Sequence, residues 1–389
     1  MTLRGTDGID TQQPAPQATI PWIDLKRQYL EHKDEVDGAV QRVLESIRYV
    51  IGPEGDAFER EWADYCGARY AVALGSGTTA INLTLKALGV GPGDEVITVG
   101  FTVSASLDAI VDLGATPVLV DVDPATYTLD PSLIAAKLTP RTKAILPVHV
   151  YGHPVDVDAI LAAAGDVAVV LDACEGHGTL YRGKQASSMA TASCFSFYPT
   201  KNLGALGDAG ALVTNDEALA TRVRLLRQHG WDRRYHSVET SLNSRMDEIH
   251  AAVLRAKLPH LDAWNDRRRE IARHYDAALE GSVIRRAPNA EWADPCYYFY
   301  VVGSPDRSEL QRSLAEAGVG TDISWPEPPY LQPAYARFGY ALGDLPVTER
   351  LSNEVLTIPM FPSLTDEEVA RIGIALKSFD NIISHIHSP

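Results

Sequence analysis

Lys201 lies in a segment whose residue types could do chemistry. An apolar run ends at Ser196, a turn containing Pro199 follows, and Lys201 then precedes a glycine-rich run into a second apolar segment. A lysine amine confined on such a tight backbone, beside the hydroxyl groups of Ser196 and Thr200, can form a Schiff base with a carbonyl cofactor such as pyridoxal phosphate. The ordinary alternative is a solvated loop lysine, because most lysines are exposed.

A second segment has the composition of an anion-binding site. Gly75–Ala80 follows the apolar run Tyr70–Leu74 and opens a helical pattern. Small residues there let backbone N–H groups approach an anion, the helix N-terminus favours negative charge, and Thr78 and Thr79 add hydroxyl donors. The alternative is an ordinary helix N-cap.

Two further positions carry candidate polar ligands. Asp172 ends the apolar run Ala168–Asp172, where an unpartnered carboxylate would be costly. A protonated pyridine nitrogen would supply the missing partner, although a capping or salt-bridged aspartate fits the pattern as well. Asn243 and Arg245 precede a helical pattern and could bind an anion, or act as an N-cap and a solvated arginine.

Composition narrows the class of protein. The chain has 389 residues, 45% of them hydrophobic, and a formal net charge of −16, which argues against nucleic-acid binding. The four cysteines lack CxxC or paired spacing, so we predict no metal site, no disulfide framework and a reducing compartment. Because residues 1–20 have no apolar signal region and no run is long enough to span a membrane, we expect a cytoplasmic protein that does not bind membranes.

Short apolar runs alternate with helical patterns through the first half of the chain. This alternation predicts an α/β fold with a mainly parallel sheet covered by helices on both faces. The predicted strands are Tyr70–Leu74, Glu95–Val99, Pro117–Val122, Ala144–His149, Ala168–Asp172, Ala192–Phe197 and Ala211–Thr214. The predicted helices between them are Thr78–Leu88, Ser104–Leu113, Pro131–Leu138 and Asp156–Ala163.

The flanking regions complete the predicted organisation. An amphipathic helix is expected from Ile23 to Arg48, and the chain from Asp216 to Leu279 is mainly helical. Beyond about Val283, short strands and helices mix. We therefore predict a disordered tail at 1–20, a large cofactor-binding domain at 21–265 and a smaller C-terminal α/β domain at 266–389.

Several ordered motifs resemble the DegT/DnrJ/EryC1/StrS family of pyridoxal-phosphate-dependent sugar aminotransferases, which have fold type I, like aspartate aminotransferase. The pattern Ser-Phe-x-x-Thr-Lys-Asn-Leu-Gly is met in full at 196–204, and the resemblance runs from about Ile23 to Ile382. Further matches are Gly-Asp-Glu-Val-Ile at 93–97, Asn-Ser-Arg-Met-Asp-Glu-Ile at 243–249, Leu-Gln-Pro-Ala-Tyr at 331–335, Leu-Pro-Val-Thr-Glu-Arg-Leu at 345–351 and Ile-Pro-Met-Phe-Pro at 358–362.

The resemblance implies a role for each candidate residue. Lys201 is the lysine that binds pyridoxal 5'-phosphate and moves protons, and Asp172 binds the pyridine nitrogen. Asn243 is expected to reach the phosphate of the neighbouring subunit's cofactor, which implies a homodimer with shared active sites. The phosphate ligands within the chain are expected to be Gly77, Thr78 and Ser196.

The chain departs from the family pattern at three places. Glu175 stands where the family often has Gln near the cofactor's phenolic oxygen, so a second carboxylate lies close to Asp172 in sequence. Val103 takes the place of an aromatic ring that stacks on the cofactor. Ser324 and Tyr330 replace histidines of a lip that shapes the substrate pocket.

The implied reaction transfers an amino group from L-glutamate to a keto-sugar attached to a nucleoside diphosphate, giving an amino sugar. A dTDP-linked keto-6-deoxyhexose is expected, with amination at C-4 favoured over C-3. Alternatives are amination of a free cyclitol ketone, or a sugar dehydratase of the same family, although dehydratases typically replace the lysine with histidine. A non-catalytic cofactor-binding module is a further alternative, which the acidic charge and the presence of Lys201 disfavour.

Overall fold

The computed structural model describes residues 19–287 and 289–386. Most of the predicted tail therefore lies outside the described residues. Ile20, at the end of that predicted tail, is only 1% exposed and forms a parallel bridge with Val319. The start of the described chain is thus anchored on the C-terminal part of the molecule.

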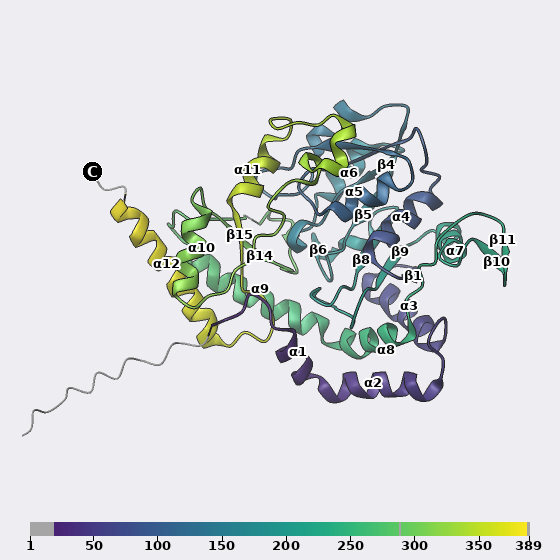
Figure 1. The fold of residues 1–389 in the computed structure, drawn as a ribbon, viewed down its shortest axis with the longest axis horizontal. Helices are drawn as coiled ribbons and strands as arrows, with labels where there is room; N and C mark the ends of the chain where they lie inside the picture. The colour runs from purple at the N-terminus through teal and green to yellow at the C-terminus, as the bar shows by residue number, and fades with distance from the viewer. Residues whose placement is uncertain (1–18, 288, 387–389) are drawn as a thin grey trace, which may run out of the picture.

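A seven-stranded sheet forms the centre of the molecule, as Figure 1 shows. Its strand order is β1-β9-β8-β5-β4-β2-β3, and β9 alone within this sheet runs antiparallel to its neighbours. The prediction of a mainly parallel sheet is therefore confirmed. The strands are β1 (Tyr70–Leu74), β2 (Glu95–Val99), β3 (Thr116–Val120), β4 (Thr142–Leu146), β5 (Ala168–Asp172), β8 (Ala192–Ser196) and β9 (Gly210–Thr214).

Helices cover both faces of this sheet, because its strands are apolar on both sides (Figure 1). In β1, Val72 and Leu74 belong to the apolar cluster on one face, whereas Ala71 and Ala73 belong to the cluster on the other. The first face packs against α4 (Gly77–Ala87), α5 (Ser104–Val111) and α7 (Glu217–Leu226). The opposite face packs against α3 (Pro53–Cys66), α6 (Val157–Ala164) and α8 (Glu248–Lys257).

The C-terminal part of the chain forms a second apolar core around a small antiparallel sheet. Ile20 belongs to this core together with residues from 271 to 379. The predicted domain boundary at 265 falls inside α9, and that boundary stays a prediction. The sheet consists of β12 (Arg285–Arg286), β14 (Tyr300–Gly303) and β15 (Val355–Ile358), and the helices of this part are α9 (Leu261–Ala278), α10 (Arg307–Glu316), α11 (Pro346–Glu354) and α12 (Asp366–Ile386).

Several predicted helices differ from the structure. The expected helix from Ile23 to Arg48 is broken at His32, whose φ of −121° and ψ of 22° are not helical. The two resulting helices are α1 (Leu25–Glu31) and α2 (Lys33–Ser46). The predicted helix Pro131–Leu138 is instead two 3-10 turns, Pro131–Leu133 and Ala135–Lys137.

Short elements complete the described chain. The β10–β11 hairpin interrupts the mainly helical region between α7 and α8, and a three-stranded sheet has the order β13-β6-β7. No helix within the described ranges has the length and hydropathy needed to cross a membrane. The minor strands are β6 (Leu180–Tyr181), β7 (Lys184–Gln185), β10 (Trp231–Arg233), β11 (His236–Ser237) and β13 (Ala293–Asp294). The remaining 3-10 turns are Val150–Gly152, Ala186–Ser188, Leu258–His260, Pro329–Leu331 and Pro333–Phe338.

Candidate active site

The predicted phosphate segments meet at the carboxyl edge of the central sheet. β1 leads into the N-terminus of α4, and β8 ends at Ser196. A Cβ added at Gly77 would lie 2.6 Å from Cys174 Sγ and 2.7 Å from Ser196 Cβ. A larger residue at Gly77 would thus separate the start of α4 from Ser196, and the structure requires glycine at this position.

The first turn of α4 is fixed by hydroxyl groups. Ser76 caps the helix by accepting a hydrogen bond from the Thr79 backbone N–H at 3.1 Å. The Ser244 hydroxyl, which sequence reasoning did not single out, donates to Thr79 Oγ1 at 2.6 Å and accepts from the Gly75 N–H at 3.1 Å. Thr78 is half-buried in this turn. First-turn N–H groups lack intrahelical partners, so this rigid turn can bind a phosphate.

Asp172 ends β5 and is only 4% exposed. Its carboxylate accepts hydrogen bonds from the Ser106 hydroxyl at 2.7 Å and from the Cys174 N–H at 3.2 Å. The Thr102 hydroxyl lies 2.9 Å from the Ser106 hydroxyl. Because Ser106 donates its own proton to Asp172, Thr102 is the donor in this hydrogen bond. The sequence predicted Asp172 but missed Ser106, whose only signal was its place in the first turn of a predicted helix.

Lys201 is held in a tight turn by its backbone N–H, which donates to the Tyr198 carbonyl at 2.8 Å. Its amine Nζ lies 3.2 Å from Glu175 Oε1, and its side chain is only 12% exposed. Nζ also lies 3.9 Å from the centre of the Tyr298 ring. The structure therefore excludes the alternative of a solvated loop lysine.

Tyr298 is a site residue that sequence reasoning missed. Its hydroxyl lies 2.9 Å from Thr200 Oγ1, so the residue next to Lys201 is tied to the ring beneath the lysine amine. Thr200 thus uses its hydroxyl in a contact with Tyr298. No local signal marked Tyr298, because it lies far along the chain from the lysine that it contacts.

The ionisation of Lys201 reflects two opposing effects. Burial lowers the pKa of the Lys201 amine, but the Glu175 carboxylate and, less strongly, Tyr298 raise it, and the net result lies above the ordinary lysine value. In the chain without cofactor the Glu175 charge prevails, and the amine holds its proton.

Glu175 is itself fixed by the fold. Its Oε2 accepts a hydrogen bond from the Tyr151 N–H at 2.7 Å, while Oε1 faces Lys201. Tyr151 has a φ of 57°, and its ring stacks on Trp325, which has a φ of 56°, at 4.8 Å between centroids. Two strained aromatic residues thus hold the backbone group that orients this carboxylate.

The remaining predicted residues lie at the edges of this site. Val103 is 45% exposed and directly precedes α5, the helix that carries Ser106. Asn243 is exposed and forms an isolated backbone bridge with Gln228. In the lip, Ser324 is buried with its hydroxyl 2.9 Å from Thr357 Oγ1.

Tyr330, the other lip residue, is buried as well. It is 1% exposed and its hydroxyl donates to Glu349 at 2.9 Å. The side chains of Ser324 and Tyr330 therefore join the lip to β15 and α11.

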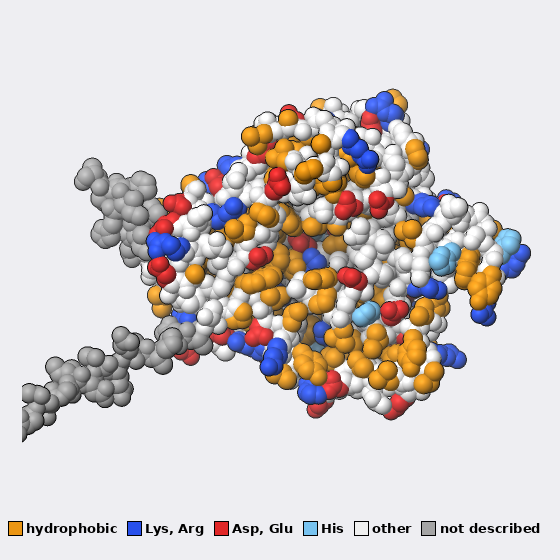
Figure 2. Space-filling model, viewed as in Figure 1, with side chains coloured by type: hydrophobic (Ala, Val, Ile, Leu, Met, Phe, Trp, Pro, Cys, Tyr) orange, Lys and Arg blue, Asp and Glu red, His pale blue; other side chains and the backbone are white. Residues whose placement is uncertain are grey.

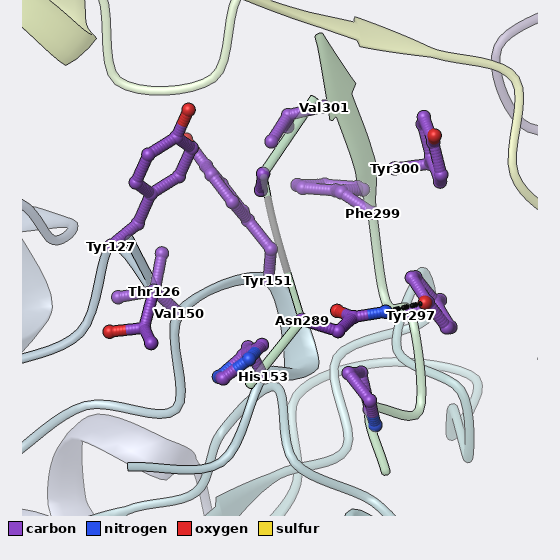
Figure 3. A pocket seen from close by; sticks show the side chains of 12 residues that line it. Thr126, Tyr127, Val150, Tyr151, His153, Asn289, Tyr297, Phe299, Tyr300 and Val301 are labelled. Atoms are coloured by element: carbon purple, nitrogen blue, oxygen red, sulfur yellow. Dashed lines mark hydrogen bonds between the residues drawn. The ribbon is translucent and has the colours of Figure 1, made fainter. Parts of the chain in front are cut away.

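The surface is hollowed near the middle of the face in Figure 2, where acidic and basic side chains lie on the floor between hydrophobic groups. A separate cavity of about 30 Å³ is lined by Tyr127, Tyr151, His153 and Phe299, as Figure 3 shows. This volume holds one or two water molecules, so the cavity is too small for a cofactor or a sugar.

The donor set at the carboxyl edge fits pyridoxal phosphate. The α4 N-terminus with Ser196 suits the phosphate, Asp172 suits a protonated pyridine nitrogen, and Lys201 supplies the amine. Glu175 lies against that amine, where it would face the phenolic oxygen. When bound, the cofactor supplies an electron sink that stabilises the carbanion left by proton removal.

This fold and this donor set define a pyridoxal-phosphate-dependent aminotransferase of fold type I. The chain belongs to the DegT/DnrJ/EryC1/StrS aminotransferase family, whose profile matches residues 31–377. The predicted family, fold, enzyme class and cofactor are thereby confirmed.

Two relatives and one solved structure document the similarity. The erythromycin biosynthesis sensory transduction protein EryC1 of Saccharopolyspora erythraea is 46% identical over 92% of this chain and 99% of that protein. The dTDP-3-amino-3,4,6-trideoxy-alpha-D-glucose transaminase of Streptomyces venezuelae is 43% identical over 92% of this chain and 96% of the relative. The crystal structure of S. venezuelae DesV with a ketimine intermediate aligns with a TM-score of 0.92 at 42% identity, covering 94% of this chain and 99% of DesV.

The close contact at Gly77 predicts a strong effect of one methyl group. Gly77→Ala should weaken pyridoxal phosphate binding at least about tenfold, or about 1.4 kcal/mol, because the new Cβ displaces Ser196 and the first turn of α4. The measurement is an absorbance titration of cofactor-free protein. Gly91→Ala is the matched control, since its added Cβ meets no atom within 4 Å. Equal affinities for Gly77→Ala and the wild type would contradict this account of the phosphate site.

The contact between Glu175 and Lys201 predicts a shift in the pH dependence of lysine reactivity. Glu175→Gln removes the charge that raises the pKa of Lys201, so the amine should lose its proton at lower pH than in the wild type. The test is the pH profile of Lys201 labelling by trinitrobenzenesulfonate in cofactor-free protein, read by peptide mass spectrometry. The matched control is Glu95→Gln, because Glu95 is also a buried carboxylate and pairs with Arg141. This variant should leave the pH profile of Lys201 unchanged. An unshifted profile in Glu175→Gln would show that Glu175 does not set this pKa.

Proposed function

We propose that this enzyme transfers the amino group of L-glutamate to the ketone of a dTDP-linked keto-6-deoxyhexose. The observation that carries the proposal is the buried Lys201 amine at the carboxyl edge of the sheet, the edge at which Ser106 also fixes the Asp172 carboxylate. The nucleotide-sugar substrate is supported by a transaminase that is 43% identical and whose name specifies a dTDP-3-amino sugar.

The position of the ketone is the finer part of this proposal. The family resemblance favours C-4. The name of the S. venezuelae transaminase instead specifies an amino group at C-3. We therefore place C-3 first and keep C-4 as the alternative that the same assay decides.

Three residues of this chain would take part in proton transfer: Lys201, Asp172 and Glu175. In the first half-reaction Lys201 Nζ would take the proton from the donor's α-carbon and pass it to the cofactor, and in the second it would carry a proton from the cofactor to the sugar carbon that receives the amino group. Its burial limits the access of water to this amine. Asp172 would keep the pyridine nitrogen protonated through its negative charge, and two hydrogen bonds hold its carboxylate in place. Glu175 can hold the proton of Nζ between steps, since it lies 3.2 Å away.

The rival functions fit the site less well. A sugar dehydratase of this family would typically carry histidine at the position of Lys201. A role in sensory transduction alone, which the name of EryC1 states for that protein, would not need a buried amine between a carboxylate and an aromatic ring. Amination of a free cyclitol ketone would use the same residues, so only the identity of the substrate distinguishes it from the proposed reaction.

A substrate panel tests the proposal directly. The holoenzyme with L-glutamate should aminate a dTDP-3-keto-6-deoxyhexose, detected by mass spectrometry, faster than its 4-keto isomer, its UDP counterpart or a free cyclitol ketone. Lys201→Ala should lose the activity by several orders of magnitude, because no other base replaces Nζ. Transamination that persists in Lys201→Ala would refute the role of the lysine, and a fastest rate on a cyclitol ketone would refute the substrate class.

We further propose a homodimer in which the two subunits share their active sites. Five apolar residues at the end of α2 and in the loop after it are exposed, and Figure 2 shows hydrophobic side chains gathered along this lower edge of the molecule. Such a patch is typical of a protein interface. The residues are Leu44, Ile47, Tyr49, Val50 and Ile51.

This apolar segment is joined to the loop that carries Asn243. Val50 bridges Asp247, and the Glu248 carboxylate accepts hydrogen bonds from the N–H groups of Gly52 and Gly55 at 2.9 Å. A second copy seated on the apolar segment would therefore meet the Asn243 loop as well. This supports the proposal that Asn243 reaches into the phosphate site of the partner subunit.

Subunit mixing tests the shared site. Lys201→Ala and Asn243→Ala should each be poorly active alone, whereas a mixture reassembled from the two should regain about a quarter of wild-type activity. The gain arises because half of the chains pair as heterodimers, in which one of two sites has both residues intact. A mixture no more active than its components, or an Asn243→Ala variant that binds cofactor like the wild type, would refute this arrangement.

A further inference from the structure

Three metal-ligating side chains converge away from the active site. His32 breaks the chain between α1 and α2, Glu35 lies one turn further along, and His260 directly precedes α9. One ligand atom of each residue lies within 4.8 Å of the other two. His260 Nε2 is 2.7 Å from Glu35 Oε2, and His32 Nδ1 is 3.8 Å from Glu35 Oε1.

The spacing of these ligand atoms is close to that of a metal site, and small side-chain movements would complete it. The ligands of a tetrahedral Zn²⁺ ion lie about 2.0–2.2 Å from the metal, and therefore about 3.3 Å from each other. The observed separations of 2.7 and 3.8 Å bracket that value. Because the side chain of Glu35 is 50% exposed, its carboxylate has room to turn toward the metal, and a water molecule can complete the shell.

The surroundings hold the two imidazoles in place. Their ring centroids are 4.2 Å apart, and both rings contact Trp264, which is only 7% exposed. Two imidazoles and one carboxylate suit a borderline ion such as Zn²⁺ better than Mg²⁺ or Ca²⁺, which prefer oxygen ligands.

We propose that His32, Glu35 and His260 form a binding site for a divalent transition-metal ion, with Zn²⁺ as the expected occupant. The ion would join the beginning of α2 to the beginning of α9, two segments far apart in sequence. It would therefore stabilise the attachment of the N-terminal helices to the rest of the chain, independently of transamination.

Calorimetric titration of the chelator-treated holoenzyme with zinc sulfate tests the site. The wild type should bind one Zn²⁺ that is lost, or weakened at least about tenfold, in His32→Gln, Glu35→Gln and His260→Gln. Zinc should also raise the melting temperature of the wild type but not of these variants. Unchanged visible absorbance of the bound cofactor shows that each variant is folded.

His236→Gln is the matched control. His236 also contacts a carboxylate, Asp232, at 2.6 Å, but on the β10–β11 hairpin and outside the three-ligand cluster. This variant should bind zinc like the wild type, and Co²⁺ should give the absorption of a tetrahedral site in both. Equal zinc affinity in the wild type and His260→Gln, or a preference for Mg²⁺ or Ca²⁺ over Zn²⁺, would overturn the proposal.

Discussion

The absence of a side chain at Gly77 is the constraint on which the active site depends. The start of α4 lies so close to the ends of β5 and β8 that one methyl group would contact both Cys174 and Ser196. This approach brings a helix N-terminus, a strand-end carboxylate and the Lys201 turn to one edge of the sheet. Gly210 serves the same purpose from β9, since a Cβ there would lie 2.3 Å from the Ser76 backbone. The active site therefore depends on the close approach of these backbone segments, and this approach places the functional side chains next to one another.

Glu175 dominates the electrostatics of the lysine. It places a negative charge 3.2 Å from Lys201 Nζ and raises the pKa of that amine. The Glu175 carboxylate is held in position, because the Tyr151 N–H donates a hydrogen bond to its other oxygen. A reaction that needs a neutral amine therefore depends on the positive charge of the bound cofactor to offset Glu175.

Local signals predicted the sheet and the residues along its carboxyl edge. The apolar runs that form β1, β2 and β5 are bounded by turn residues, and their predicted limits agree with the structure. Lys201 and Asp172 were predictable because the elements that carry them are continuous in sequence. The break at His32 was not, since neither Gly nor Pro marks it and the ring is positioned by His260 and Trp264.

Contacts between distant residues account for the rest of what the sequence did not predict. Tyr298 and Ser106 each meet their partners only after the chain has folded back, so no spacing rule identifies them. The role that we propose for Asn243 concerns a second subunit, and within one chain this residue lies in an exposed loop.

The position of β9 has a consequence for the order in which the molecule is made. β1 is synthesised early, yet within the described residues its one neighbour in the sheet is β9, which also separates it from β8. On a growing polypeptide, β1 and the start of α4 therefore have no strand partner until the chain has been synthesised as far as Thr214. The turn that can bind a phosphate lacks the support of the sheet until then. Chaperones that shield the early apolar strands would act during this interval.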